Sequence, residues 1–151
     1  MGRGNCDIFI LSCAISAAET KTNGQVPMKI LIVDDLKLIR DLIRTMVSRL
    51  PFISAIEEAE DVPQALHAVD RLQPDVVTLD MQLPGGTGLN VLHAIKQADH
   101  APAVIIVTNQ ADAQTRKACM AAGASFFLDK SLDMEKLPAI LHMLTGETQG
   151  S

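Results

Sequence analysis

The stretch Asp75-Val76-Val77-Thr78-Leu79-Asp80-Met81-Gln82-Leu83-Pro84-Gly85-Gly86 carries a short apolar run that leads directly into a carboxylate. Pro84, Gly85 and Gly86 then end any regular structure, because proline and glycine are strong turn formers. A short apolar run bounded by turn residues is typical of a buried strand. We therefore predict that Asp80 lies at the carboxyl end of a strand, where the chain turns into a loop.

Other apolar runs have the same form and end in polar residues. They are Met28–Val33 before Asp34 and Asp35, residues 104–107 before Thr108, and residues 125–130, which close on Lys130. Residues 54–59 form a shorter and more polar run, which predicts a strand at the edge of a sheet. Together with the run that ends at Asp80, these segments predict five strands.

Between these runs, apolar residues recur at spacings of three and four, which predicts amphipathic helices. The predicted helices cover residues 38–50, 62–72, 89–98 and 111–122, and a last one runs toward Leu144. Pro51 ends the first helix and Asp61 is a plausible N-cap of the second. Strands and helices that alternate in this way predict an α/β fold with a parallel sheet and helices on both of its faces.

One domain accounts for residues 28–145. Residues 1–27 begin with an apolar segment, Ile8 to Ala18, that could be a secretory signal. A single basic residue and the acidic Asp7 disfavour that reading, so we expect an N-terminal extension outside the domain, disordered or non-native. Residues 146–151 are expected to form a C-terminal tail.

Composition excludes several classes of function. The net charge is −5, and there is no Trp or Tyr and only four Phe, so direct nucleic-acid binding is disfavoured. The three cysteines form neither a disulfide framework nor a metal-ligand spacing. No apolar stretch is long enough to span a membrane. We expect a cytoplasmic protein.

The polar residues after the strands should converge, because the carboxyl ends of parallel strands meet at one edge of the sheet. The three carboxylates among them are those of Asp34, Asp35 and Asp80. Brought together, they repel one another and stay ionised only if a cation neutralises them. Oxygen ligands select a hard cation, and a few carboxylates with room for water suit Mg²⁺. A free carboxylate beside Mg²⁺ favours phosphoryl transfer to that carboxylate, with Lys130 and Thr108 as partners for the phosphoryl oxygens.

From Met28 to about Leu144 the chain resembles a response-regulator receiver domain of the stand-alone, chemotaxis-regulator-like kind. The matching segments are Ile32-Val33-Asp34-Asp35, Leu79-Asp80-Met81-Gln82-Leu83-Pro84-Gly85, Val107-Thr108 and Phe127-Leu128-Asp129-Lys130. The resemblance implies a doubly wound (βα)5, flavodoxin-like sandwich with strand order 2-1-3-4-5. It also implies a signalling protein rather than an enzyme.

The resemblance implies a role for each matching residue. Asp80 would be the phosphoacceptor, and Mg²⁺ would be bound by Asp34, Asp35, Asp80 and the backbone carbonyl of Gln82. Lys130 would pair with Asp80 and then with the phosphoryl group, while Thr108 and Phe127 would act as the switch. The donor would be a phosphohistidine of a sensor histidine kinase or a phosphotransfer protein. The downstream target is unknown, and the chain would be a monomer or a weak homodimer.

Alternatives remain open at this point. A phosphatase of the haloacid dehalogenase type also uses a strand-end Asp, Mg²⁺ and Lys, but it needs a second acid where Gln82 stands. A receiver-like adaptor that works without phosphorylation is the other alternative. Thr108 could be an ordinary helix N-cap, and Phe127 could be plain core.

The sequence departs from the usual receiver pattern in three places. Gly86 and Thr87 are unusual in the loop after the acceptor, and Ser131 follows the lysine where receivers usually carry proline. Pro138 falls inside the predicted last helix. With Ser131 in place of proline, the preceding peptide bond is expected to be trans, because a cis bond there costs about 2.5–4 kcal/mol.

Overall fold

The structure is a computed structural model that describes the backbone of residues 27–150 and the side chains of residues 27–145. The expectations for residues 1–26 and for the tail side chains therefore lie outside the described residues. The elements follow the order β2 Met28–Val33, α2 Lys37–Ser48, β3 Ile53–Ala59, α3 Val62–Leu72, β4 Val76–Leu79, β5 Gln82–Leu83, β6 Gly86–Thr87, α4 Gly88–Lys96, β7 Ala103–Thr108, α5 Ala113–Ala121, β8 Phe126–Asp129, η1 Met134–Lys136 and α6 Leu137–Gly150.

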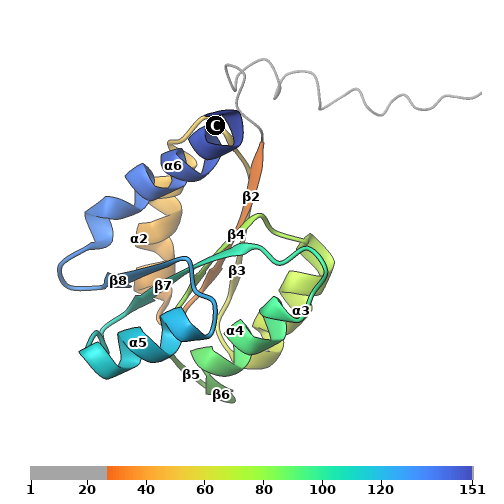
Figure 1. The fold of residues 1–151 in the computed structure, drawn as a ribbon. Coiled ribbons are helices and arrows are strands. Elements are labelled where there is room, and N and C mark those ends of the chain that lie inside the picture. The colour runs from red at the N-terminus through yellow and green to blue at the C-terminus, as the bar shows by residue number, and fades with distance from the viewer. Residues whose placement is uncertain (1–26, 151) are drawn as a thin grey trace, which may run out of the picture.

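The main sheet has five parallel strands in the order β3-β2-β4-β7-β8 (Figure 1). In chain order this is 2-1-3-4-5, so the predicted flavodoxin-like topology is confirmed. Strand order reverses between β2 and β4, which pair directly. A ligand site is expected beyond the carboxyl ends of the strands at this reversal, because the loops there diverge to opposite faces of the sheet.

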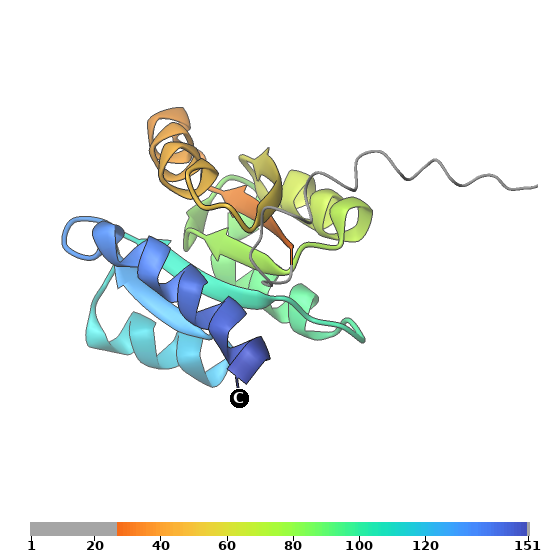
Figure 2. The ribbon, with the colours of Figure 1, turned by 90° about the horizontal axis from the view of Figure 1, so that it is seen from above.

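Helices cover both faces of the sheet (Figure 2). Alternate strand residues point to opposite faces, and the two sets enter separate cores. Leu31 and Val33 of β2 pack with α3, α4 and α5, whereas Ile30 and Ile32 pack with α2 and α6. Strands β2, β4 and β7 are buried on both sides, which explains why they read as continuous apolar runs rather than alternating ones. Strand β3 lies at the edge of the sheet, as predicted, and is only partly buried.

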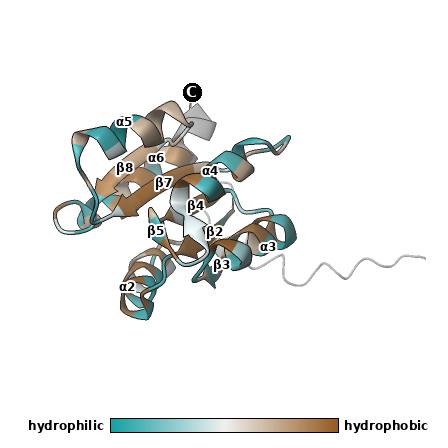
Figure 3. Cartoon of the chain, turned by 90° about the horizontal axis from the view of Figure 1, so that it is seen from below, coloured by the Kyte–Doolittle hydropathy of each residue, from teal (hydrophilic) through white to brown (hydrophobic). Residues whose placement is uncertain are grey.

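Colouring by hydropathy shows the same division (Figure 3). The strands at the centre are hydrophobic, and the hydrophilic residues of the helices face outward. None of the helices in the described part of the chain combines the length and the apolar character needed to cross a bilayer. The cores fix the strands relative to one another, so the residues that follow them have little freedom to move apart.

Most element boundaries agree with the sequence. Asp61 caps α3, accepting a hydrogen bond from the Gln64 amide at 2.8 Å, as predicted. The N-cap of α5 is Asp112, not Thr108, so the alternative role for Thr108 as a helix cap is wrong. The described residues contain no cis peptide bond, so the bond before Ser131 is trans as expected.

Three features were not predicted from the sequence. Residues of β5 and β6 form a small antiparallel hairpin across the Pro-Gly-Gly loop that follows Asp80. Pro138 is the second residue of α6 rather than an interior one, and proline there needs no backbone hydrogen bond, so it does not interrupt the helix. The backbone of α6 also runs past Leu144 to Gly150.

Candidate functional site

The four polar strand ends converge as the topology requires. Asp34 follows β2 and Asp80 follows β4, the neighbouring strands at which the sheet order reverses. Thr108 ends β7, and Lys130 follows β8 at the edge of the sheet. The main chain holds the last two together, since the Lys130 amide donates to the Thr108 carbonyl at 3.0 Å. Four separate strands therefore contribute to one site.

Lys130 lies between two buried carboxylates. Its Nζ is 2.7 Å from Asp34 Oδ2 and 3.0 Å from Asp80 Oδ2. The lysine side chain is 5% exposed, and the two carboxylate side chains are 2% and 5% exposed. Backbone amides hold the other oxygens: Leu36 N–H donates to Asp34 Oδ1 at 2.9 Å, and Gln82 N–H donates to Asp80 Oδ1 at 3.3 Å. Each carboxylate thus has both oxygens engaged and its orientation fixed.

The surroundings of the site raise the pKa of both Asp34 and Lys130. Burial raises the pKa of Asp34, and the Asp80 charge adds to the rise, while hydrogen bonds from Lys130 and Leu36 oppose it. Burial acts to lower the pKa of Lys130, but hydrogen bonds to both carboxylates outweigh it, so the net pKa is raised. Lys130 therefore stays charged, while Asp34 is destabilised as a carboxylate.

The site fits a divalent cation. Oxygens of Asp34, Asp35 and Asp80 lie within 4.8 Å of one another, and Asp35 is exposed at the mouth of the site. Three carboxylates and one ammonium group leave a formal charge of −2 (three minus one), which one divalent cation would neutralise. An all-oxygen donor set of this kind suits a hard cation such as Mg²⁺.

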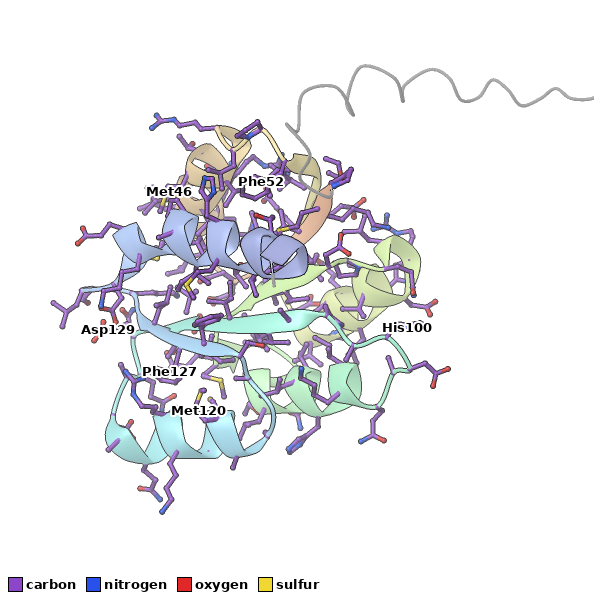
Figure 4. The ribbon with its side chains drawn as sticks, turned by 45° about the horizontal axis from the view of Figure 1, so that its top comes forward. Met46, Phe52, His100, Met120, Phe127 and Asp129 are labelled. Atoms are coloured by element: carbon purple, nitrogen blue, oxygen red, sulfur yellow. The ribbon has the colours of Figure 1, made fainter. Side chains whose placement is uncertain are left out.

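Thr108 and Phe127 lie on the side of the site nearest α5. Thr108 is fully buried, and its Oγ1 accepts a hydrogen bond from the Gln110 amide at 3.1 Å. Phe127 is 6% exposed and belongs to the core between the sheet and α5 (Figure 4). The guanidinium carbon of Arg116 on α5 lies 4.7 Å from the centre of the Phe127 ring. The aromatic ring is thus packed inward and covered by a cation.

The loop after Asp80 depends on a close backbone approach. Gly88, at the start of α4, donates its N–H to the Met81 carbonyl at 2.9 Å. A Cβ at this position would collide with the Asp80 carbonyl oxygen and lie 2.8 Å from the Met81 Cα. Only glycine lets the loop return this closely. The hairpin of β5 and β6 and the first turn of α4 therefore hold the strand end that carries Asp80.

Sequence reasoning found the polar strand ends but missed two arginines that contact residues of the site. Arg40 Nη1 donates to the Asp34 carbonyl at 2.8 Å, and Arg116 covers Phe127. Both lie on helices, where an arginine reads as an ordinary solvated residue. The one available signal is that each lies on a helix that directly follows a site loop.

Comparison with known proteins identifies the family to which the chain belongs. Residues 30–142 match the model of a protein family that is described as "Response regulator receiver domain". The chain belongs to the response regulator receiver family. Receiver domains are phosphoacceptor signalling modules rather than catalytic enzymes, which decides against the haloacid dehalogenase alternative. A cognate histidine kinase is implied by membership.

Several individual proteins are similar. A protein-glutamate methylesterase/protein-glutamine glutaminase of Myxococcus xanthus (strain DK1622) is 34% identical over 105 residues, which cover 69% of this chain and 30% of that protein. The nitrate/nitrite response regulator protein NarL of Escherichia coli (strain K12) is 26% identical over 120 residues, which cover 80% of this chain and 56% of that protein. The receiver thus spans 30% to 56% of the length of these curated relatives.

Two solved structures agree with this assignment. The two-component response regulator of the LuxR family from Aurantimonas sp. SI85-9A1 superimposes with a TM-score of 0.73 at 28% identity, over 80% of this chain and 86% of that one. The signal receiver domain of a putative Luxo repressor protein from Vibrio parahaemolyticus gives a TM-score of 0.74 at 25% identity, over 82% and 94%.

Proposed function

We propose that this receiver accepts a phosphoryl group on Asp80, in a Mg²⁺-dependent reaction, from a phosphohistidine of a sensor histidine kinase or a phosphotransfer protein. The observation that carries the proposal is the position of Lys130, whose Nζ joins Asp80 to Asp34 beside the exposed Asp35. Residues 28–145 would form the working domain, with residues 1–27 as an extension and 146–151 as a tail.

The transfer breaks the P–N bond of the phosphohistidine and forms a P–O bond to a carboxylate oxygen of Asp80, leaving a neutral imidazole after proton uptake. Side chains of Asp34, Asp35 and Asp80 and the carbonyl of Gln82 would hold Mg²⁺, which when bound supplies positive charge to the phosphoryl oxygens. Lys130 already contacts Asp80 Oδ2 and would follow the charge onto the transferred group.

Phosphorylation would then change the surface near α5 and β8. The new group brings negative charge and strong acceptor oxygens to the strand end. The Thr108 hydroxyl, now an acceptor for the Gln110 amide, would turn to donate to a phosphoryl oxygen. Phe127 packs in the core beside this movement, and the change would spread through it to α5. Output would pass through a contact with another protein.

A group of exposed leucines around the acidic site would contact the phosphodonor. Leu36 is 50% exposed, Leu38 77% and Leu132 72%, and they follow Asp34 and Lys130 closely in the chain. Large apolar side chains exposed next to a charged site are typical of a protein-binding surface. We place the receiver in the cytoplasm, as a monomer or weak homodimer, without direct contact to nucleic acid.

The test is phosphoryl transfer from purified histidine kinases of the same cell, with and without a chelator. Transfer from one kinase should be fast, chelator-sensitive and about 10-fold slower with Leu38→Glu, which places a charge in the donor interface. The matched control is Leu66→Glu on α3, an exposed leucine remote in the chain from the site residues. Labelling by acetyl phosphate should be unchanged in both variants. Failure of every kinase and of acetyl phosphate would favour the phosphorylation-independent adaptor.

A further inference from the structure

We propose that Arg40 is a positioning residue for the metal-binding loop, and that Glu58 holds it in place. The inference rests on the proposed function, because it concerns the residues that would hold Mg²⁺. The two neighbouring carboxylates differ in the contacts that hold them. Asp34 is held by Lys130 and by the Leu36 amide, whereas Asp35 has no hydrogen bond or ion pair within residues 27–145. Something other than its own side-chain contacts must aim Asp35.

The backbone between the two aspartates supplies that control. Arg40 Nη1 donates to the Asp34 carbonyl oxygen at 2.8 Å. This oxygen belongs to the peptide group that joins Asp34 to Asp35, so holding it limits the directions that the Asp35 side chain can take. On the other side of Asp34, its N–H donates to the Ala59 carbonyl at 3.1 Å. The Asp34 backbone is therefore fixed at both of its polar groups.

Glu58 completes the arrangement from β3. Arg40 Nε lies 2.9 Å from Glu58 Oε1, and the two side chains are 11% and 23% exposed. Arg44 Nε lies 2.6 Å from the other oxygen, Glu58 Oε2. The planar guanidinium of Arg40 thus spans Glu58 and the Asp34 carbonyl with donors in a fixed fork, which a flexible ammonium group could not do.

Edge strand β3 therefore holds the loop twice. Ala59 binds the Asp34 amide directly, and Glu58, the residue before it, binds the Asp34 carbonyl through Arg40. Because the side chains of Arg40 and Glu58 are largely buried, this bridge is shielded from solvent and keeps its geometry. Residues that orient a metal ligand typically change metal affinity by 10–100-fold when they are replaced.

Arg44 provides a matched control. It is an arginine one helical turn further along α2 and shares Glu58 as its partner, but no hydrogen bond within the described side chains joins it to Asp34. Both arginines carry the same charge near the acidic site. Removing a cation there should by electrostatics alone tighten Mg²⁺ binding. Loss of positioning predicts the opposite sign for Arg40, so the two effects can be separated.

The experiment measures Mg²⁺ binding by isothermal titration calorimetry on the full chain, with Tm recorded for each variant. Arg40→Ala and Arg40→Lys should each weaken Mg²⁺ binding, by about 10-fold for the alanine variant, and Glu58→Gln should weaken it less. Arg44→Ala should bind as tightly as wild type or more tightly. In acetyl phosphate labelling, saturating Mg²⁺ should restore the rate of Arg40→Ala, which separates a binding defect from a lost reacting group.

Two results overturn the inference. Mg²⁺ affinity equal to wild type in Arg40→Ala and Arg40→Lys would show that the loop needs no bridge. Equal weakening in Arg40→Ala and Arg44→Ala would assign the effect to general loss of stability. If wild type itself bound no Mg²⁺, the proposed function would fall and the inference with it, so the failures are distinguishable.

Discussion

Lys130 and Asp80 come from different strands, yet Nζ of the lysine lies 3.0 Å from Oδ2 of the aspartate, with each side chain only 5% exposed. A second carboxylate, Asp34, lies closer still to the same ammonium group. One lysine therefore neutralises parts of two buried carboxylates. This arrangement holds the acceptor in place but leaves the site with excess negative charge, which makes its stability sensitive to cations.

Replacing Lys130 by Met should test that sensitivity directly. The variant keeps most of the side-chain volume but leaves two buried carboxylates without a protein cation, which typically costs about 3–5 kcal/mol of folding free energy. Mg²⁺ should recover more stability in Lys130→Met than in wild type, because it would replace the missing charge. Urea unfolding with and without a chelator measures both. An identical Mg²⁺ effect in the two proteins would contradict the prediction.

The stability of the metal-free receiver should respond to Asp34 with a defined sign. Burial raises the Asp34 pKa above the ordinary 3.8. Between 3.8 and that raised value the folded state binds more protons than the unfolded state, so this group lowers stability as pH rises through the window. Asp34→Asn should remove this loss. Urea unfolding in chelator from pH 3.5 upward compares the variants, and parallel curves would refute the assignment.

Thr108→Ala should separate labelling from switching. Among the described side chains, no hydrogen bond joins the Thr108 hydroxyl to a carboxylate, but it accepts one from the Gln110 amide at 3.1 Å. Because Thr108 is fully buried, loss of this hydroxyl should cost about 1 kcal/mol of stability. Asp80 should still be labelled, while the change in amide exchange near α5 that follows labelling should shrink. Thr108→Ser keeps the hydroxyl and serves as the control. A full change in Thr108→Ala would remove Thr108 from the switch.

Arg116 should stabilise the inward position of Phe127. Its guanidinium carbon lies 4.7 Å from the ring centre, and a cation in this position contributes about 0.5–1 kcal/mol at an exposed site. Arg116→Ala should lose that amount and shift the Phe127 ring resonances in NMR spectra. Lys117→Ala, which removes the neighbouring exposed cation, should change neither. If Arg116→Ala and Lys117→Ala behave alike, the contact of Arg116 with the ring does not stabilise the position of Phe127.

The sequence predicted the strand ends well because each is an apolar run that closes on a charged or hydroxyl residue. Asp34, Asp80, Thr108 and Lys130 could be placed at one sheet edge from topology alone. The Gln82–Thr87 hairpin could not be predicted, because each of its strands has only two residues and leaves no periodic pattern to read.

Contacts from helix side chains were also beyond reach. Arg40 lies on α2 and Glu58 lies 18 residues later on β3, and nothing in the local pattern pairs them. Likewise, the sequence indicated that Pro138 lies inside the last helix rather than at its start, because the helix start at Leu137 has no strong sequence signal. Local residue patterns determine where helices and strands form, whereas contacts between them depend on how each helix is oriented as it packs on the sheet.

The proposed function requires Asp80 to accept the phosphoryl group with the help of a divalent cation. Intact-protein mass spectrometry after incubation with acetyl phosphate and Mg²⁺ tests it most directly, by counting acid-labile phosphate on wild type and on Asp80→Asn. Wild type should gain one phosphoryl group and lose it in acid, the chelator should prevent labelling, and Asp80→Asn should remain unlabelled with its fold intact. Equal labelling of the two proteins, or labelling that a chelator does not diminish, would show that Asp80 is not a cation-dependent phosphoacceptor.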